Sequence, residues 1–161
     1  MDLKEFFLKQ KQATYQNSLK VFQAIPPDQL GWRPAEGMLS LGQIVRHVGM
    51  SEAGVRRVAI ENVWEYYERR VPLGLFKLLG EVTSLAEEMA LLEQIHQQTM
   101  SAVEAFPIDR WEEERRNDAF NVHTKVAVML FGINEHNTHH RAQVGTYLHL
   151  LTGRRASHYA I

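Results

Sequence analysis

The sequence of 161 residues contains no cysteine. This absence excludes disulfides, thiolate metal ligands and a cysteine nucleophile within the chain. Proline is also scarce, since there are five and none lies beyond Pro107. Because proline interrupts helices, the proline-free stretches of roughly 3–25, 41–66, 84–106 and 122–152 are the candidates for long helices.

Long apolar runs and an excess of charge of one sign are missing as well. No segment approaches the ~20 apolar residues of a membrane span, and the N-terminal "MDLKEFFLKQKQ" lacks the apolar core of a signal peptide. The formal net charge is −1 at pH 7, which gives no general attraction for nucleic acid or anionic membranes. We therefore expect a soluble cytoplasmic protein that binds neither nucleic acid nor a membrane.

Apolar residues return at helical spacing in each of the four stretches, and they belong to a chain that is 45% hydrophobic. Ser40 with Gln43, and Ser84 with Glu87, have the spacing of capping boxes at helix starts. Gly153 is a natural terminator for the last helix. No run alternates with period two for long enough to predict a strand.

These patterns predict an all-α fold, a four-helix bundle formed by a single domain of residues 1–161. The connection "IPPDQLGWRPAEGM" is rich in turn-forming residues and separates the first two helices. A short extra helix is expected around Leu73–Leu79, within the connection between the second and third helices.

The stretch "NEHNTHHRAQVGTYLHLLTG" holds three of the eight histidines within five positions. His136 and His140 continue the apolar stripe of the last helix, whereas His139 lies on a polar row. Imidazoles at positions i and i+4 can converge on one metal ion, as in H-E-x-x-H sites, although that protease motif is absent. The alternative is a pair of hydrogen-bonded core histidines.

Two further histidines belong to other predicted helices. His47 lies on the inward flank of the second helix, followed by the small residues Ser51 and Gly54. These small residues indicate either an open cavity beside the histidine or close helix packing. His96 is a fourth ligand, a cavity residue or a satisfied histidine at the edge of the core, and we favour the last. The remaining histidines are expected at the surface: His123, His149 and His158.

Two segments together resemble the DinB/YfiT-like superfamily of metal-dependent proteins. "AIPPDQLGWRPAEGMLSLGQIVRHV" resembles its first linker and second helix, and "NEHNTHHRAQVGTYLHLLTG" its H-x-x-x-H-R-G-Q signature, with Ala142 in place of the glycine. The resemblance implies an up-down-down-up bundle with a long crossover between helices two and three. It also implies that His47, His136 and His140 bind a divalent metal ion, zinc or nickel.

Some members of the superfamily transfer low-molecular-weight thiols, so the resemblance implies a metal-dependent thiol S-transferase. Three histidine ligands leave a coordination position open, at which a thiol or water can be activated. A hydrolase is therefore a second enzymatic interpretation. A non-catalytic stress-response protein that binds a metal or small ligand, and a helical scaffold, are the alternatives. Because the chain has no cysteine, the thiol would come from a small-molecule co-substrate.

Supporting residues around the site follow from spacing. Gln143 is three residues after His140, so it either contacts a ligand imidazole or makes a helix-interface hydrogen bond. Ser51 and Tyr147 are further candidates for the cavity, although Tyr147 also suits core filling. Glu52 is an available acid without the spacing of a convincing base, and we assign no general acid or base.

The resemblance also leads us to expect a homodimer. Trp64, Tyr66 and Tyr67 form either an exposed aromatic patch for that contact or ordinary packing at the end of the second helix. Light scattering should give the mass of a dimer across micromolar concentrations. A monomer mass over the same range contradicts the prediction.

Overall fold

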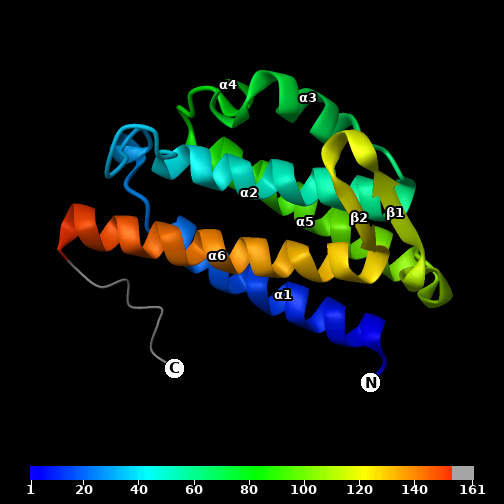
Figure 1. Cartoon of the computed structure of the whole chain (residues 1–161). Helices are drawn as coiled ribbons and strands as arrows, with labels where there is room; N and C mark the ends of the chain where they lie inside the picture. The colour runs from blue at the N-terminus through cyan, green and yellow to red at the C-terminus, as the bar shows by residue number, and fades with distance from the viewer. Residues whose placement is uncertain (154–161) are drawn as a thin grey trace.

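Four long helices lie side by side in the computed structural model, which describes residues 1–153 (Figure 1). They are α1 (Leu3–Phe22), α2 (Leu41–Arg56), α5 (Leu85–Ala105) and α6 (Val126–Thr152). α1 and α6 run in one direction and α2 and α5 in the other, which is the up-down-down-up order (Figure 1). The prediction of an all-α bundle is therefore confirmed. The expected surface position of His158 lies outside the described residues.

The starts of α1, α2 and α5 lie close to where the sequence predicts them because local capping groups define them, whereas α2 ends at Arg56, well before the expected end near residue 66. The Asp2 carboxylate and the Ser84 hydroxyl each accept the backbone N–H three residues later. At the start of α2, Ser40 and Gln43 form a complete capping box. Gly153 ends α6 with a φ of 69°, a left-handed conformation that glycine adopts without strain.

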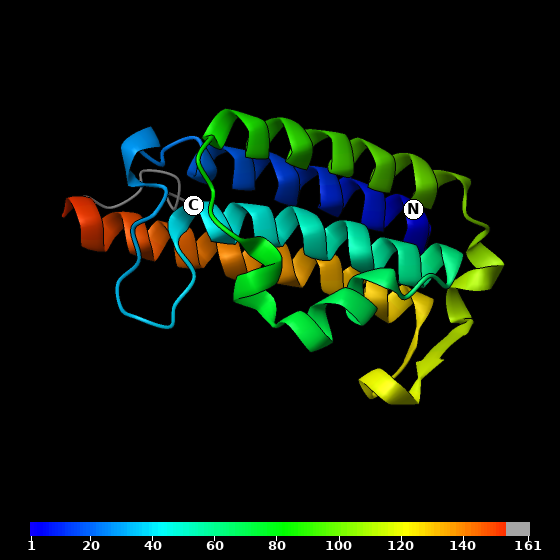
Figure 2. The same ribbon diagram turned by 90° about the horizontal axis from the view of Figure 1, so that it is seen from above.

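The connection from α2 to α5 contains more structure than one short helix. A π-helical turn, η2 (Arg57–Glu61), follows α2, and two helices come next, α3 (Glu65–Leu73) and α4 (Leu75–Leu79). They cross over on the side of α2 that faces away from α1, as Figure 2 shows. A Cβ atom at Gly54 would lie 2.4 Å from the Tyr66 ring, so this glycine permits close packing of α3.

A β-hairpin precedes α6, and no strand was expected there. Its strands are β1 (Glu114–Asn117) and β2 (Val122–Lys125), which pair antiparallel with Arg115 opposite Thr124. The two strands, ERRN and VHTK, contain Val122 as their only apolar residue, so the sequence shows no alternation of apolar and polar residues there. The expected helical stretch from residue 122 is therefore wrong at its beginning, since residues 122–125 are a strand and α6 begins at Val126.

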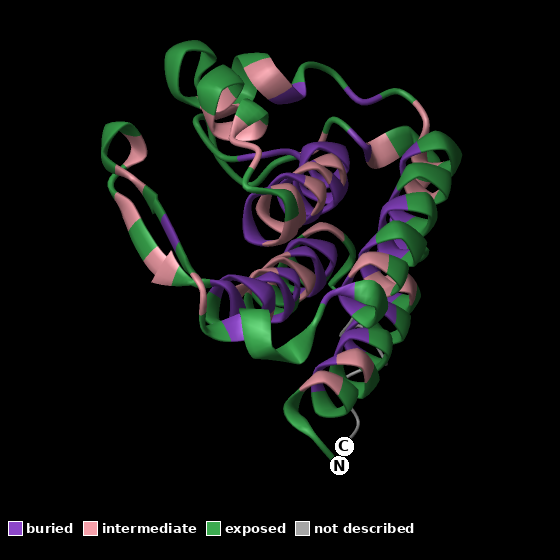
Figure 3. Ribbon diagram, turned by 90° about the vertical axis from the view of Figure 1, so that its right-hand side faces the viewer, coloured by how far each residue is buried: buried purple, intermediate pink, exposed green. Residues whose placement is uncertain are grey.

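Buried side chains cover the inner faces of the four helices, and exposed ones cover the outer faces (Figure 3). The apolar core consists of two clusters at opposite ends of the bundle. One contains Phe22, Ile44 and Tyr147, and the other contains Phe7 and Leu130. None of the helices within residues 1–153 has the length and apolar character needed to cross a membrane.

A buried ion pair lies between these two clusters. Lys11 of α1 donates to Glu52 Oε2 of α2 at 2.7 Å, and both side chains are fully buried. Asn137 of α6 donates to the same oxygen at 2.8 Å. Three helices therefore meet in a polar layer, where each charge depends on its partner because water is excluded.

Replacing Lys11 with methionine should destabilise the protein by about 3–5 kcal/mol, because it leaves the Glu52 carboxylate buried without its counter-charge. The double variant Lys11→Met/Glu52→Gln should recover most of that loss, since the amide that replaces the carboxylate is neutral. Urea unfolding measures both free energies. Lys9→Met, which removes the exposed ion pair with Glu5 on the same helix, is the control and should change stability little. Equal losses for Lys11→Met and Lys9→Met would contradict this account.

Candidate metal centre

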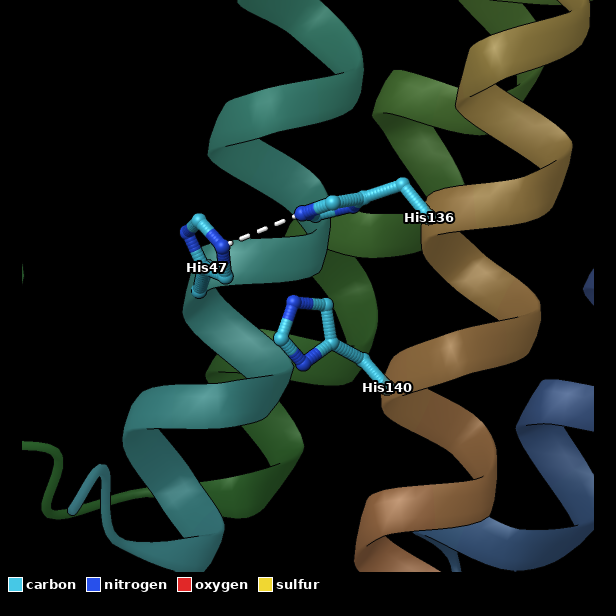
Figure 4. Close-up of side chains that lie close together, drawn as sticks. All are labelled: His47, His136 and His140. Atoms are coloured by element: carbon cyan, nitrogen blue, oxygen red, sulfur yellow. Dashed lines mark hydrogen bonds between the residues drawn. The ribbon is translucent and has the colours of Figure 1, made fainter.

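Three histidines from two helices converge beside the polar layer. His47 lies on α2, while His136 and His140 lie one turn apart on α6, and the three imidazoles face one another (Figure 4). The Nε2 atoms of His47 and His136 are 3.1 Å apart. One potential ligand atom from each ring lies within 4.8 Å of the others. His139, in contrast, is exposed and does not belong to this cluster.

Hydrogen bonds on the far sides of the rings orient two of the imidazoles. His140 Nδ1 lies 2.8 Å from Gln143 Oε1, and since an amide oxygen only accepts, Nδ1 carries the proton and Nε2 keeps its lone pair. His47 Nδ1 lies 3.1 Å from Ser51 Oγ, which leaves its Nε2 toward His136. Partners of this kind fix the tautomer and direction of metal-binding histidines.

A further residue supports each of these two partners. Ser51 Oγ is 2.9 Å from the hydroxyl of Tyr66 on α3. The side-chain amide of Gln143 donates to the Tyr147 hydroxyl at 3.1 Å. Tyr147 is itself buried and packs edge-on against Trp32. The three supporting candidates from the sequence therefore all lie within two hydrogen bonds of a clustered imidazole.

The three imidazoles are neutral at physiological pH. Burial lowers the pKa of His47 to about 3, and the charges of His136 and His140 contribute further. Burial also lowers the pKa of His136 to about 4. The pKa of His140 is lowered by burial, against which its hydrogen bond to Gln143 acts. Neutral imidazole is the form that binds a metal ion.

The geometry and the donor set fit a divalent ion. Tetrahedral ligation with bonds of roughly 2.0–2.1 Å places two nitrogen ligands about 3.3 Å apart, which is close to the 3.1 Å between the Nε2 atoms of His47 and His136. The cluster consists of imidazoles alone among the described residues. These three residues could therefore hold a metal ion such as zinc or nickel, for which imidazole is a suitable ligand.

A cavity of about 310 Å³ adjoins the histidine cluster. His136 and Ser51 belong to its wall, and α3 closes it with Tyr66, Tyr67 and Arg70. The aromatic residues proposed for a dimer surface, Trp64, Tyr66 and Tyr67, are all half-buried. Tyr66 and Tyr67 line the cavity, and Trp64 belongs to its surroundings. Packing at the end of α2 accounts for them, and the homodimer stays a prediction.

His96 occupies a different place from the one we favoured. It is buried, with 4% of its surface exposed, so it is not at the edge of the core. Its Nε2 lies 2.9 Å from Gln12 Oε1, and its ring stacks on Tyr15 at 3.8 Å between centroids. It does not belong to the three-histidine cluster. His123 and His149 are exposed, as expected.

Sequence reasoning missed Lys11 and Arg70 near this site, and it named Glu52 only as an available acid. Lys11 lies between Phe7 and Tyr15 on the inward stripe of α1, and Glu52 continues the inward row of α2 after Val48. A charged residue at helical spacing between core positions was the available signal. Arg70, half-buried on the crossover, carried no comparable signal because its position depends on how α3 packs.

The family described as the DinB superfamily matches the chain over residues 10–144. Among solved structures, a DinB-like protein (YjoA) from Bacillus subtilis aligns with a TM-score of 0.64 and 19% identity. The alignment covers 94% of this chain and 91% of that one, so the two share a fold. No curated protein matches the sequence.

The lowered histidine pKa values predict that the protein, kept free of metal by EDTA, loses stability in acid. The unfolded chain binds protons at each clustered histidine near pH 6.5, whereas folded His47 and His136 resist protonation down to about pH 3 and 4. Stability should therefore be highest above pH 6.5 and fall as the pH drops toward 4. Urea unfolding across this range should show a weaker pH dependence for His136→Gln. His139→Gln is the matched control, and an unchanged pH dependence in His136→Gln would contradict the assignment.

Proposed function

The chain belongs to the DinB superfamily, and on that basis we propose that it is a metal-dependent enzyme. In this proposal His47, His136 and His140 bind one divalent ion that activates a small thiol or water. The observation that carries it is the convergence of the three imidazoles while Ser51 and Gln143 hold the far nitrogens of two of them. A structural role alone does not require this arrangement.

The position of the cluster favours chemistry over a purely structural metal site. Three protein ligands leave a coordination position for an exogenous ligand, which is typical of catalytic zinc. His136 belongs both to the cluster and to the wall of the cavity, so a small molecule in the cavity reaches the site. When bound, the metal ion lowers the pKa of a coordinated thiol or water and produces a nucleophile near neutral pH.

The residues of the chain determine where the thiol comes from and what positions the imidazoles. The sequence has no cysteine, so the sulfur of a thiol transfer comes from a low-molecular-weight co-substrate. Ser51 and Tyr66 hold His47, and Gln143 with Tyr147 holds His140. We assign these four residues to positioning the imidazoles. The alternative, capture of a metal or small ligand without turnover, uses the same site and differs only in the fate of the bound molecule.

Metal content of protein purified without a histidine tag tests the site. We expect close to one zinc or nickel ion per chain by elemental analysis. His136→Ala and His140→Ala should each reduce this to a trace, because two imidazoles rarely hold such an ion against a chelator. His139→Ala removes an exposed neighbour on the same helix and should leave the metal content unchanged.

The variants that lose the metal ion show whether the assigned ligand set is right. Loss of metal in His139→Ala with retention in His140→Ala would mean that the ligand set is wrong. A screen of low-molecular-weight thiols against alkylating electrophiles, and of esters and amides, should then be run on the metal-loaded protein. Turnover that disappears in His140→Ala supports the enzyme, whereas full metal occupancy without turnover favours the binding protein.

A further inference from the structure

The cavity beside the histidine cluster contains a positive charge that the protein does not neutralise. Among the residues that line it, only Glu52 and Arg70 carry a formal charge. Glu52 is paired with Lys11 at 2.7 Å. The Arg70 side chain makes no hydrogen bond or ion pair with any residue of the described range 1–153, and the residue is half-buried. The guanidinium therefore offers its donors to whatever occupies the cavity.

The carboxylate of Glu52, the other charged group of this wall, is already engaged within the protein. Lys11 and Asn137 both donate to Oε2. Oε1 is buried and has no hydrogen-bond partner across residues 1–153. Because this oxygen is closed off from the cavity and Lys11 balances the charge of Glu52, the carboxylate does not cancel the attraction of Arg70 for an anion.

Apolar and aromatic side chains form most of the remaining wall. They come from α2, α3 and α6 and include Val55, Tyr67, Met129 and Ile133. A cavity with such walls and a few polar groups is typical of a small-molecule site. Its volume of about 310 Å³ accommodates a compact organic molecule.

We propose that this cavity binds a small organic acid with an apolar body, whose carboxylate pairs with Arg70. The inference deepens the function proposed above and rests on it for the role of the acid as the substrate presented to the metal site. Because His136 lines the same cavity, the bound acid lies beside the histidine cluster. Arg70 is thus a substrate-binding residue.

The test uses 3-phenylpropionate as the probe, with its amide as the uncharged analogue. Methyl NMR titration follows Met129 and Ile133, which line the cavity. The acid should bind at least about tenfold more tightly than its uncharged amide, because a hydrogen bond to a charged group is stronger than one to a neutral group.

Arg70→Gln should weaken binding of the acid at least about tenfold and leave binding of the amide unchanged. Arg69→Gln is the matched control, since Arg69 is exposed on the same helix and does not line this cavity. Equal affinity for acid and amide, equal affinity of Arg70→Gln and the unchanged protein for the acid, or the absence of saturable shifts would overturn the proposal.

Titrations with EDTA and with added zinc separate this inference from the proposed function. Binding of the acid that depends on Arg70 in EDTA, in a protein that fails the metal test, upholds the anion site and rejects the metal-dependent enzyme. Stoichiometric metal binding that requires His140, together with acid binding that is independent of Arg70, rejects the anion site alone.

Discussion

The interaction between Lys11 and Glu52 is the constraint around which the centre of the bundle is arranged. The pair lies where apolar packing is interrupted, between the two hydrophobic clusters, and Asn137 completes it from a third helix. Because a buried charge without its partner is costly, this contact holds α1, α2 and α6 in register. The same register brings His47 opposite His136, because His47 lies five residues before Glu52 on α2 and His136 directly precedes Asn137 on α6.

The crossover supplies what the four long helices lack, which is the outer wall of the cavity. Gly54 lets α3 approach α2 closely enough for the Tyr66 hydroxyl to reach Ser51, and Ser51 in turn contacts His47. Arg70 follows Tyr66 by one helical turn and faces the same cavity. The imidazoles are thus oriented by α3, which lies outside the four-helix bundle, as well as by residues of the bundle itself. A short segment with few fully buried residues of its own determines the polarity of the site.

Local patterns were sufficient for the four-helix architecture and for the rows on which His136, His139 and His140 lie. Capping groups at Asp2, Ser40 and Ser84 define helix starts, because they act within three residues. The +4 spacing puts His136 and His140 on one face, since helical geometry depends on position alone. The hairpin and the burial of His96 were not predicted, because short strands have little pattern and a single histidine fits either side of an amphipathic boundary.

The sequence by itself determined an all-α chain of four long helices, a pair of inward imidazoles on the last helix and their resemblance to one superfamily. Only the tertiary structure decided which groups meet across helices. It pairs Lys11 with Glu52, sets Ser51 and Gln143 behind two imidazoles, and places Arg70 at the cavity. The physical reason is that helical periodicity describes one helix at a time, whereas these contacts depend on the packing and relative register of separate helices.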